Sequence, residues 1–220
     1  MSYPDNGITI VPGTSLPDQS WWPQLHTVII ESFRNKKSSV YPPTWTRLDP
    51  DPVKGAAGLS KELGADGHYA VLISNDGVPV AGGGVLPYRG DNWINEAFSK
   101  SDKVALNPPT TNAIEESTAG TTNIPDWEVC CFCVHPSERG KGHSTKLIDA
   151  LLRLIASKGA QRLFSNYAVD ETGNFWSKLG FELVPAAGGM LPIGFKVDPQ
   201  KEGLRANVYF KMGVKMLQND

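Results

Sequence analysis

The sequence predicts an α/β fold: a mixed central sheet of about six or seven strands flanked by about four helices. Three observations support this. Segments rich in β-branched and aromatic residues alternate with segments of helical periodicity. The 220 residues, 40% of them hydrophobic, suffice to bury a substantial core without disulfides or metals. A turn containing two glycines, over residues 140–142, joins a strand-like segment to an amphipathic one. We expect one domain over residues 1–220.

The first third of the chain is expected to contain three strands and two helices. An Asn-Asp-Gly turn over residues 75–77 is typical of a β-hairpin. Prolines keep the stretch between the two helices irregular. The strands are expected over residues 8–11, 68–74 and 78–86, and the helices over residues 21–33 and 53–63.

An insertion from Pro87 to Asp126, approximately residues 87–126, separates the third and fourth strands. It contains a helical pattern over residues 94–100 and a polar stretch rich in Thr, Asn and Pro. Inserted loops of this length are usually functional or disordered. We expect residues 88–98 to be ordered and to form part of a substrate wall, with residues 107–123 mobile. A surface excursion without function is the alternative.

The rest of the chain alternates strands and helices. Residues 127–134 are rich in β-formers and end before Pro136, and apolar residues recur at helical spacing from Ser144 to Lys158. Gly159 and Gly180 are typical of helix ends. A second helix is expected over residues 172–179, and further strands over residues 162–168, after Gly180, and over residues 205–212.

The turn over residues 139–144, Arg-Gly-Lys-Gly-His-Ser, is suited to binding an anion. Gly140 and Gly142 allow positive φ, so successive N–H groups can point at one ligand. The following helix adds roughly half a positive charge at its N-terminus, and Arg139 and Lys141 add formal charge. The spacing fits neither the Walker loop nor the dinucleotide fingerprint. A simple strand-helix connection with solvated basic residues is the alternative.

This turn resembles the Q/R-x-x-G-x-G/A pyrophosphate loop of the GNAT superfamily of acetyl-CoA-dependent N-acetyltransferases. Ser144 stands where that family usually has Gly or Ala, and Ser is a good helix N-cap. A second segment, Asn-Phe-Trp-Ser-Lys-Leu-Gly-Phe over residues 174–181, is similar to the F/L-Y-x-K-x-G-F signature that ends the family's last core helix. The resemblance covers roughly residues 68–214 and implies the GNAT fold.

The resemblance also implies acetyl-CoA as cosubstrate, an amine acceptor and no metal. In this superfamily, backbone N–H groups near the splayed end of the fourth strand bind the thioester carbonyl and the pantetheine arm, and a β-bulge would re-aim them. The residues expected to bind the cofactor are Phe132, Cys133, Val134, Arg139, Gly140, Lys141, Gly142, His143, Ser144, Asn174, Trp176 and Lys178.

Direct attack of a primary amine on the thioester requires a base, an oxyanion donor and help for the leaving thiolate. By resemblance to the histone-acetylating branch, Glu128 is the expected base. Asp126 is its nearest rival, and a solvent-facing Glu is the alternative. Trp176 stands where the family often has a Tyr that protonates the thiolate, and an indole N–H cannot act as an acid. Tyr167 and Tyr209 are therefore the candidate acids, unless the thiolate leaves unaided.

Cys130, Cys131 and Cys133 are expected to be buried free cysteines. Successive strand residues face opposite sides, so Cys130 should face away from the other two and bridging is geometrically poor. No second Cys/His cluster completes a zinc site. A reactive thiol is the minority alternative. Free cysteines suit a reducing cytosol, so we expect a cytoplasmic protein.

Composition excludes several classes of protein. A net charge of −2 gives no reason to expect nucleic-acid binding or a basic membrane-binding face. No apolar run approaches the ~20 residues of a membrane span, and the first residues lack the pattern of a secretory signal. We expect a monomer or homodimer that acetylates a small-molecule or peptide amine. An acyl-CoA-binding protein with little transferase activity, or an unrelated α/β domain binding another anion, are the alternatives.

Overall fold

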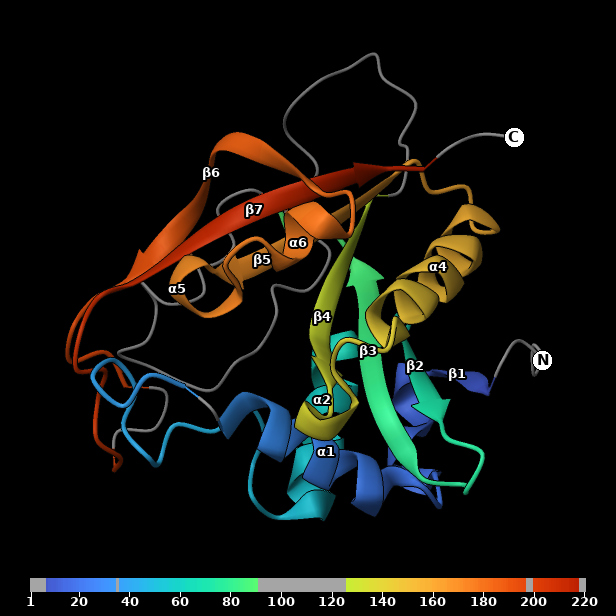
Figure 1. Ribbon diagram of the computed structural model, residues 1–220, viewed down its shortest axis with the longest axis horizontal. Helices are drawn as coiled ribbons and strands as arrows, with labels where there is room; N and C mark the ends of the chain where they lie inside the picture. The colour runs from blue at the N-terminus through green and yellow to red at the C-terminus, as the bar shows by residue number, and fades with distance from the viewer. Residues whose placement is uncertain (1–6, 35, 91–125, 197–199, 218–220) are drawn as a thin grey trace.

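A single seven-stranded sheet forms the centre of the computed structural model, which describes residues 7–34, 36–90, 126–196 and 200–217 (Figure 1). The strand order is β1-β2-β3-β4-β5-β7-β6. Neighbouring strands are antiparallel, except that β4 and β5 are parallel. The predicted mixed sheet is therefore confirmed. The strands are β1 Ile8–Pro12, β2 His68–Ile73, β3 Pro79–Pro87, β4 Trp127–Val134, β5 Arg162–Ala168, β6 Glu182–Leu191 and β7 Val208–Met216.

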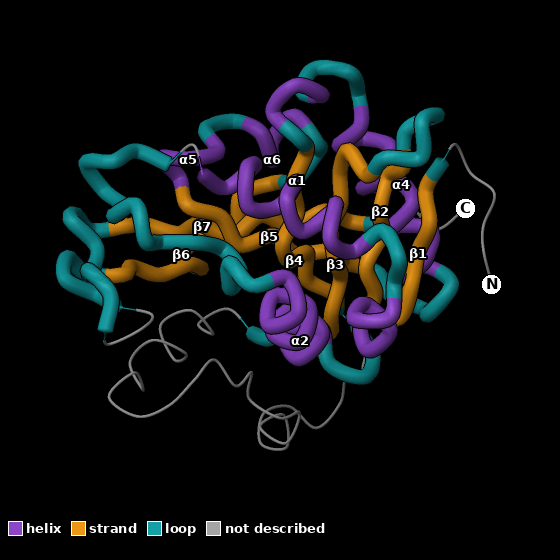
Figure 2. The backbone as a smooth tube through the Cα atoms, turned by 90° about the horizontal axis from the view of Figure 1, so that it is seen from below, coloured by secondary structure: helices purple, strands orange, loops and turns teal. Residues whose placement is uncertain are grey.

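Helices cover both faces of the sheet, and Figure 2 shows α4 and α6 on one side with α2 on the other. On one face, α4 buries Leu147, Leu151 and Ile155 against apolar residues of β2 to β5. On the other, α1 and α2 bury residues such as Leu25 and Leu59 against β2, β3 and β4. The helices are α1 Trp22–Arg34, α2 Pro52–Leu63, α4 His143–Ala156, α5 Val169–Thr172 and α6 Phe175–Lys178, with 3-10 turns η1 Gly13–Asp18 and η2 Pro136–Glu138.

Two predicted helix boundaries are corrected by backbone conformation. Helix α4 starts at His143 because Gly142 is its N-cap, in the left-handed region with φ 79°. Ser144 therefore lies in the first turn and does not cap the helix. The expected helix over residues 172–179 is wrong in extent, because α5 already ends at Thr172 and α6 covers only Phe175–Lys178. Gly173, with φ 52°, ends the first of them.

The last strand begins three residues later than expected and extends further. The backbone N–H of Arg205 donates to Val40 O (2.8 Å), and Asn207 Oδ1 accepts from the Ile193 N–H (2.8 Å), so both residues belong to the connection before β7. Residues beyond Met212 instead continue the pairing with β5, as far as Met216 opposite Arg162. The predicted alternation in β7 is confirmed, since Val208 is buried and Tyr209 is exposed.

The pairing of β4 with β5 is short and creates a split in the sheet. Residues Trp127–Val129 pair with Leu163–Ser165, and the described residues show no further pair between these strands. From Asn166 onward, β5 pairs with β7 alone. The two strands lie side by side at one end and diverge toward their C-terminal ends (Figure 1). Beyond Val129, the edge of β4 that faces β5 is thus left without a partner among the described strands.

A β-bulge lies in β4 where the split opens, as the resemblance implied. Gly84 pairs with Cys130 and Gly82 with Cys133, so two residues of β4 oppose Gly83. Cys131 has φ 45°, a left-handed conformation that costs roughly 1–2 kcal/mol for a residue with a Cβ. Phe132 lies so close to Gly83 that a Cβ there would be 2.4 Å from the Phe132 ring. Glycine is therefore required opposite the bulge.

The bulge also corrects the predicted orientation of the cysteines. All three pack in the core cluster beneath α1 and α2, because the extra residue puts Cys130 on the same face as Cys133. They are buried and free, as predicted. Burial raises the pKa of the Cys131 thiol to about 11 and raises those of the other two as well. A reactive thiolate is therefore disfavoured.

The insertion is held at its base where β3 ends. The Tyr88 N–H donates to Asp126 O (3.0 Å), and the Tyr88 ring stacks on Phe164 with 4.0 Å between centroids. The expected ordered wall beyond Gly90, the helix over residues 94–100 and the stretch over residues 107–123 lie outside the described residues. In the part of the chain that is described, no helix is long and apolar enough to span a membrane.

Candidate functional site

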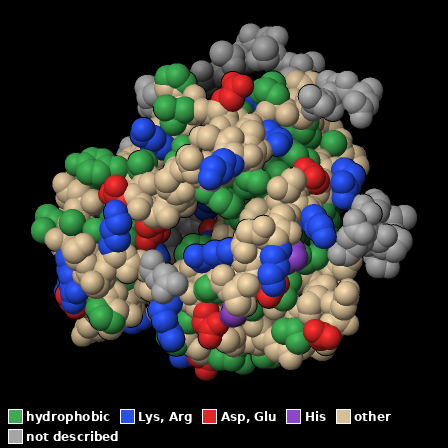
Figure 3. Space-filling model, in the orientation of Figure 1, with side chains coloured by type: hydrophobic (Ala, Val, Ile, Leu, Met, Phe, Trp, Pro, Cys, Tyr) green, Lys and Arg blue, Asp and Glu red, His purple; other side chains and the backbone are tan. Residues whose placement is uncertain are grey.

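The site lies where β4 and β5 diverge, between the helices of the two faces. Figure 3 shows the molecule hollowed between α5 and the end of α1, beside β4, with acidic and basic side chains around the hollow. Strand β4 ends here at Val134 and leads into the anion-binding turn. Strand β5 ends at Ala168 and leads into α5. Both connections follow the carboxyl ends of the only parallel pair among the described strands.

The predicted anion-binding turn has the expected backbone conformation. Gly140 and Gly142 both have positive φ, 81° and 79°. No heavy atom outside their chain neighbours lies within 4 Å of the position a Cβ would take at either residue. The first helical bond that reaches back to the cap is Lys146 N–H to Gly142 O (3.2 Å), and no side chain caps the helix. The N–H groups of the first turn therefore remain available to an anion.

The charged side chains of the turn have different partners. Lys141 donates to both oxygens of Glu138 at 2.9 Å, and this bond holds the pKa of Glu138 below its usual value. His143 Nε2 also lies 3.4 Å from Glu138. The Arg139 side chain instead donates to Val134 O (3.4 Å) and Ser32 O (3.2 Å). Arg139 therefore ties the end of β4 to α1, and only its backbone belongs to the turn.

Trp176 lies in an aromatic cluster on the α4 and α6 face of the split. Trp176 is 7% exposed. The distances from its ring centroid to those of neighbouring rings are 5.8 Å to Phe132, 6.1 Å to Tyr167, 5.2 Å to Phe175 and 5.1 Å to Phe181. The indole Nε1 is buried without a hydrogen-bond partner among the described residues. Trp176 thus joins the bulge of β4, the end of β5 and α6.

The two candidate acids occupy different environments. Tyr167, in the last part of β5, stacks on Trp176, and burial raises its pKa. Tyr209 is 55% exposed and pairs with Met190 of β6, beyond the last β5–β7 pair at Ala168 and Phe210. The structure therefore brings Tyr167, but not Tyr209, next to Phe132 and Trp176.

Lys178, predicted to bind the cofactor, lines a cleft of about 250 Å³ between α4 and α6. The cleft begins at Thr145 in the first turn of α4, next to the anion-binding turn. Lys215 also lines it and donates to Leu179 O (2.6 Å). Asn174 is exposed at the N-cap of α6. Of the three predicted residues in the second motif, Lys178 lines the cleft beside α4, Trp176 lies in the aromatic cluster and Asn174 lies at the start of α6.

Glu128 lies on the opposite face and is completely buried. Its carboxylate accepts two bonds from Arg89, Nη2 to Oε1 at 2.7 Å and Nε to Oε2 at 3.2 Å. Asn166 Nδ2 donates to Oε1 at 3.0 Å. The predicted solvent-facing alternative is wrong. The rival Asp126 pairs with Arg162 at the closed end of β4 and β5, away from the split.

The Glu128 carboxylate belongs to a buried charge network that sequence reasoning missed. Glu62 on α2 bonds to Arg47 at 2.6 Å and lies 3.7 Å from Arg89. Burial alone would lower the pKa of Arg89, but its carboxylate partners raise it. The only signal in the sequence was an Arg two residues after the third strand, and its partners are distant along the chain.

Residues 30–181 of this chain match the Acetyltransferase (GNAT) family. The chain belongs to the GNAT family. The predicted resemblance is thereby confirmed. The matched segment contains the insertion, the split strands, the anion-binding turn and the α5–α6 region. Among the described residues, no cluster of His, Cys, Asp and Glu could hold a metal ion.

Solved structures share this GNAT fold at low sequence identity. A polyamine N-acetyltransferase of Drosophila melanogaster, which forms N-acetylagmatine, is 15% identical with a TM-score of 0.56, over 96% of this chain and 100% of that one. A phosphinothricin acetyltransferase of Sinorhizobium meliloti, in complex with acetyl-CoA, is 15% identical with a TM-score of 0.53, over 96% of this chain and 89% of that one. An N-acetyltransferase of Staphylococcus aureus is 13% identical with a TM-score of 0.53, over 96% of this chain and 98% of that one. No curated protein matches the sequence.

The anion-binding turn generates a prediction about charge at Gly142. We expect Gly142→Asp to bind acetyl-CoA at least about fivefold more weakly than Gly142→Asn, because like charges 4 Å apart repel by about 1 kcal/mol even in water. Both variants carry a side chain of similar size at positive φ, so their difference isolates the charge. Isothermal titration measures both affinities. Equal affinities would show that no phosphate lies at this turn.

Proposed function

We propose that this GNAT protein transfers an acetyl group from acetyl-CoA to a primary amine of a small molecule or peptide, by direct attack in a ternary complex. The observation that carries the proposal is the split itself. One edge of β4 lacks a strand partner beside the anion-binding turn, and a buried carboxylate lies on the opposite face. A donor can therefore enter on the α4 side and an amine on the α1 and α2 side.

The donor side fits the parts of acetyl-CoA in order. The N–H groups from Gly140 to Ser144 would hold the pyrophosphate. The bulge and the open edge of β4, around Phe132, Cys133 and Val134, would hold the pantetheine arm and the thioester carbonyl. Lys178, in the cleft next to the first turn of α4, would add positive charge for the nucleotide end. Acetyl-CoA supplies an activated acyl group with a thiolate leaving group.

The α1 and α2 side, where the amine would bind, has oxygen atoms that can accept hydrogen bonds from the amine. Asn166 is the first β5 residue beyond the last pair with β4. Its Oδ1 atom is buried and has no hydrogen-bond partner among the described residues. Its Nδ2 atom donates a hydrogen bond to Glu128 Oε1. An unmade bond of this kind costs about 1–3 kcal/mol, which an amine N–H donating to Oδ1 would recover. The adjacent Glu128 is our candidate for the base, and Tyr167 for the acid.

Isothermal titration with acetyl-CoA, followed by thiol detection across a panel of small and peptide amines, tests the proposal. We expect binding and amine-dependent thiol release, with both reduced in Gly142→Asp. Absence of binding would exclude the acetyl-CoA assignment. Binding without thiol release for any amine would favour the alternative, a CoA-binding protein with little activity. That alternative is motivated by Trp176 and by the hydrogen bonds that already occupy Glu128.

Glu128→Gln tests the base. Because general bases typically contribute about 10²–10⁴-fold, we expect turnover at neutral pH to fall by about 10²-fold or more while acetyl-CoA affinity stays nearly unchanged. Asp126→Asn, the same change at the rival carboxylate, should keep its turnover. A pH-rate profile separates a catalytic role from a structural one. Loss of a base removes the fall in rate at acidic pH, whereas loss of packing leaves that fall in place. Unchanged turnover in Glu128→Gln would remove this residue from the mechanism.

Trp176→Tyr tests the position that differs from the family signature. A smaller ring in the aromatic cluster should cost roughly 1–3 kcal/mol in the free energy of unfolding, less than the ~3–5 kcal/mol of truncation to Ala. We expect acetyl-CoA affinity to stay within about threefold, a difference below 1 kcal/mol. Trp176→Phe is the matched control without a hydroxyl. Loss of acetyl-CoA binding in both variants would contradict our placement of α6 as a support of the site.

A further inference from the structure

We propose that Lys36 is an internal acetyl acceptor, and that its ε-amine takes the acetyl group of acetyl-CoA bound in the split. This inference rests on the proposed function. It names a specific amine within the chain, which that function does not require. Lys36 lies outside every motif found in the sequence, and the catalytic arrangement described above does not use it.

Ser32 and Lys36 make contacts on the two sides of the open end of the split. Ser32, one turn earlier on α1, donates to Val134 O at the end of β4 (3.0 Å). At the other end, Lys36 Nζ lies 3.8 Å from Glu171 Oε1 on α5, three residues after β5 ends. Ser32 therefore contacts the end of β4, and the Lys36 amine lies at α5, which follows β5 on the other side of the split.

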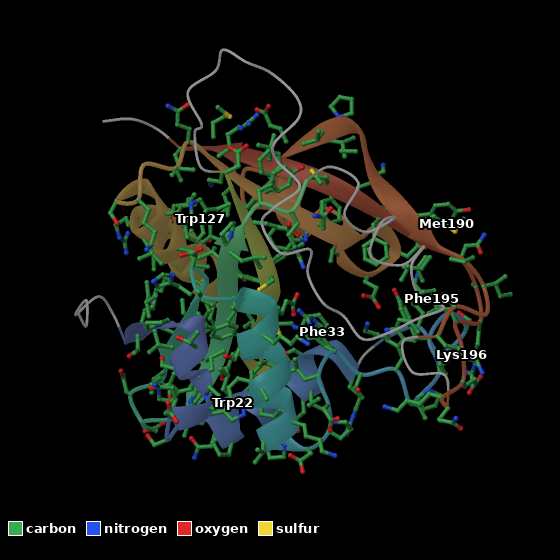
Figure 4. The ribbon with its side chains drawn as sticks, turned by 180° about the vertical axis from the view of Figure 1, so that it is seen from behind. Trp22, Phe33, Trp127, Met190, Phe195 and Lys196 are labelled. Atoms are coloured by element: carbon green, nitrogen blue, oxygen red, sulfur yellow. The ribbon has the colours of Figure 1, made fainter. Side chains whose placement is uncertain are left out.

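The aromatic neighbours of Lys36 locate its amine on the acceptor face. Nζ lies 4.4 Å from the Tyr41 ring centre and 5.9 Å from that of Phe33. Tyr41 packs with Ala168 of β5, and Phe33 packs against the cluster that contains the β4 cysteines. Figure 4 shows Phe33 on the side of α1 and α2 that faces the loop carrying Phe195. The amine thus lies beside two rings, one packed against the core cluster beneath α1 and α2 and the other in the cluster that includes Ala168 of β5.

The surroundings of Lys36 favour its reactive form. Its side chain is 14% exposed. Burial lowers the pKa of Lys36, an effect that Glu171 opposes and Arg47 reinforces. Burial likewise raises the pKa of Glu171. A partly desolvated amine beside a carboxylate of raised pKa can lose its proton to that carboxylate more readily than a solvated lysine can. The neighbouring Lys37 is exposed and provides the contrast.

The transfer balances with acetyl-CoA as the only co-reactant. The Lys36 ammonium gives one proton to Glu171, and the free amine attacks the thioester carbonyl carbon. A C–N bond forms, the C–S bond breaks, and the departing thiolate takes the second proton from nitrogen. The products are N-acetyl-Lys36 and CoA thiol, and Glu171 releases its proton to solvent. Acetylation removes the charge that pairs Lys36, two residues beyond α1, with Glu171 of α5.

The test is incubation of the full chain with acetyl-CoA, without an added amine, followed by intact mass measurement and peptide mapping over time. We expect the mass of one acetyl group to appear on Lys36 roughly tenfold or more faster than on Lys37, as proximity to a bound donor provides. Lys36→Arg keeps a cation and should abolish the modification. Lys37→Arg, the matched control, should leave it unchanged. Glu171→Gln should slow it.

Several outcomes would overturn the inference. Equal rates at Lys36 and Lys37, or an unchanged rate at Lys36 in Gly142→Asp, would mean background chemistry without a bound donor. Titration and the amine panel, run on the same samples, separate the two proposals. If acetyl-CoA binds and external amines are acetylated while Lys36 stays unmodified, the inference fails and the proposed function stands. If acetyl-CoA does not bind, both fail.

Discussion

The short parallel pairing of β4 and β5 is the constraint on which the rest of the structure depends. The two strands pair only as far as Val129 and Ser165, and the bulge at Cys131 and Phe132 follows at once. Backbone N–H and C=O groups of a strand need partners when they are buried. Beyond that point, none of the described strands provides partners for the edge of β4 that faces the split. A ligand lying along this edge would act as the missing strand, and the turn at Gly140 and Gly142 lies at its end.

A charged side chain near the split destabilises the fold unless it has a partner of opposite charge. Here the charged side chains form a chain of ion pairs. Arg47, Glu62, Arg89 and Glu128 alternate in sign, and Asn166 closes the series at β5. Removing Arg89 would leave the charge of the fully buried Glu128 side chain uncompensated, which typically costs about 3–5 kcal/mol. The network joins α2 to β4, and Arg89 lies where the insertion begins. It therefore holds the acceptor face of the split in one arrangement.

The two faces of the split differ in chemistry. The α4 and α6 face has an aromatic cluster around Trp176, backbone N–H groups at the start of α4 and lysines in the adjoining cleft. The α1 and α2 face has carboxylates, an amide oxygen without a hydrogen-bond partner among the described residues, and the Lys36 amine beside aromatic rings. In the proposed function, the acyl donor with its phosphates would bind the first face and the amine the second. Arg139 and Ser32 connect them, because both bond to the backbone at the end of β4.

Local patterns in the sequence determined most of the elements and the anion-binding turn. The bounds of β4 and β5 were predicted as observed, since strand propensity and the flanking Pro136 act over a few residues. The turn was predictable because positive φ at Gly140 and Gly142 is a local property. Only the tertiary structure decided which side chains meet. The bulge placed Cys130 beside Cys133, packing enclosed Trp176, and folding brought Arg89 to Glu128 and Lys36 to Glu171. These pairs are 39 and 135 residues apart, so their contacts depend on how the sheet and helices assemble, which no local pattern specifies.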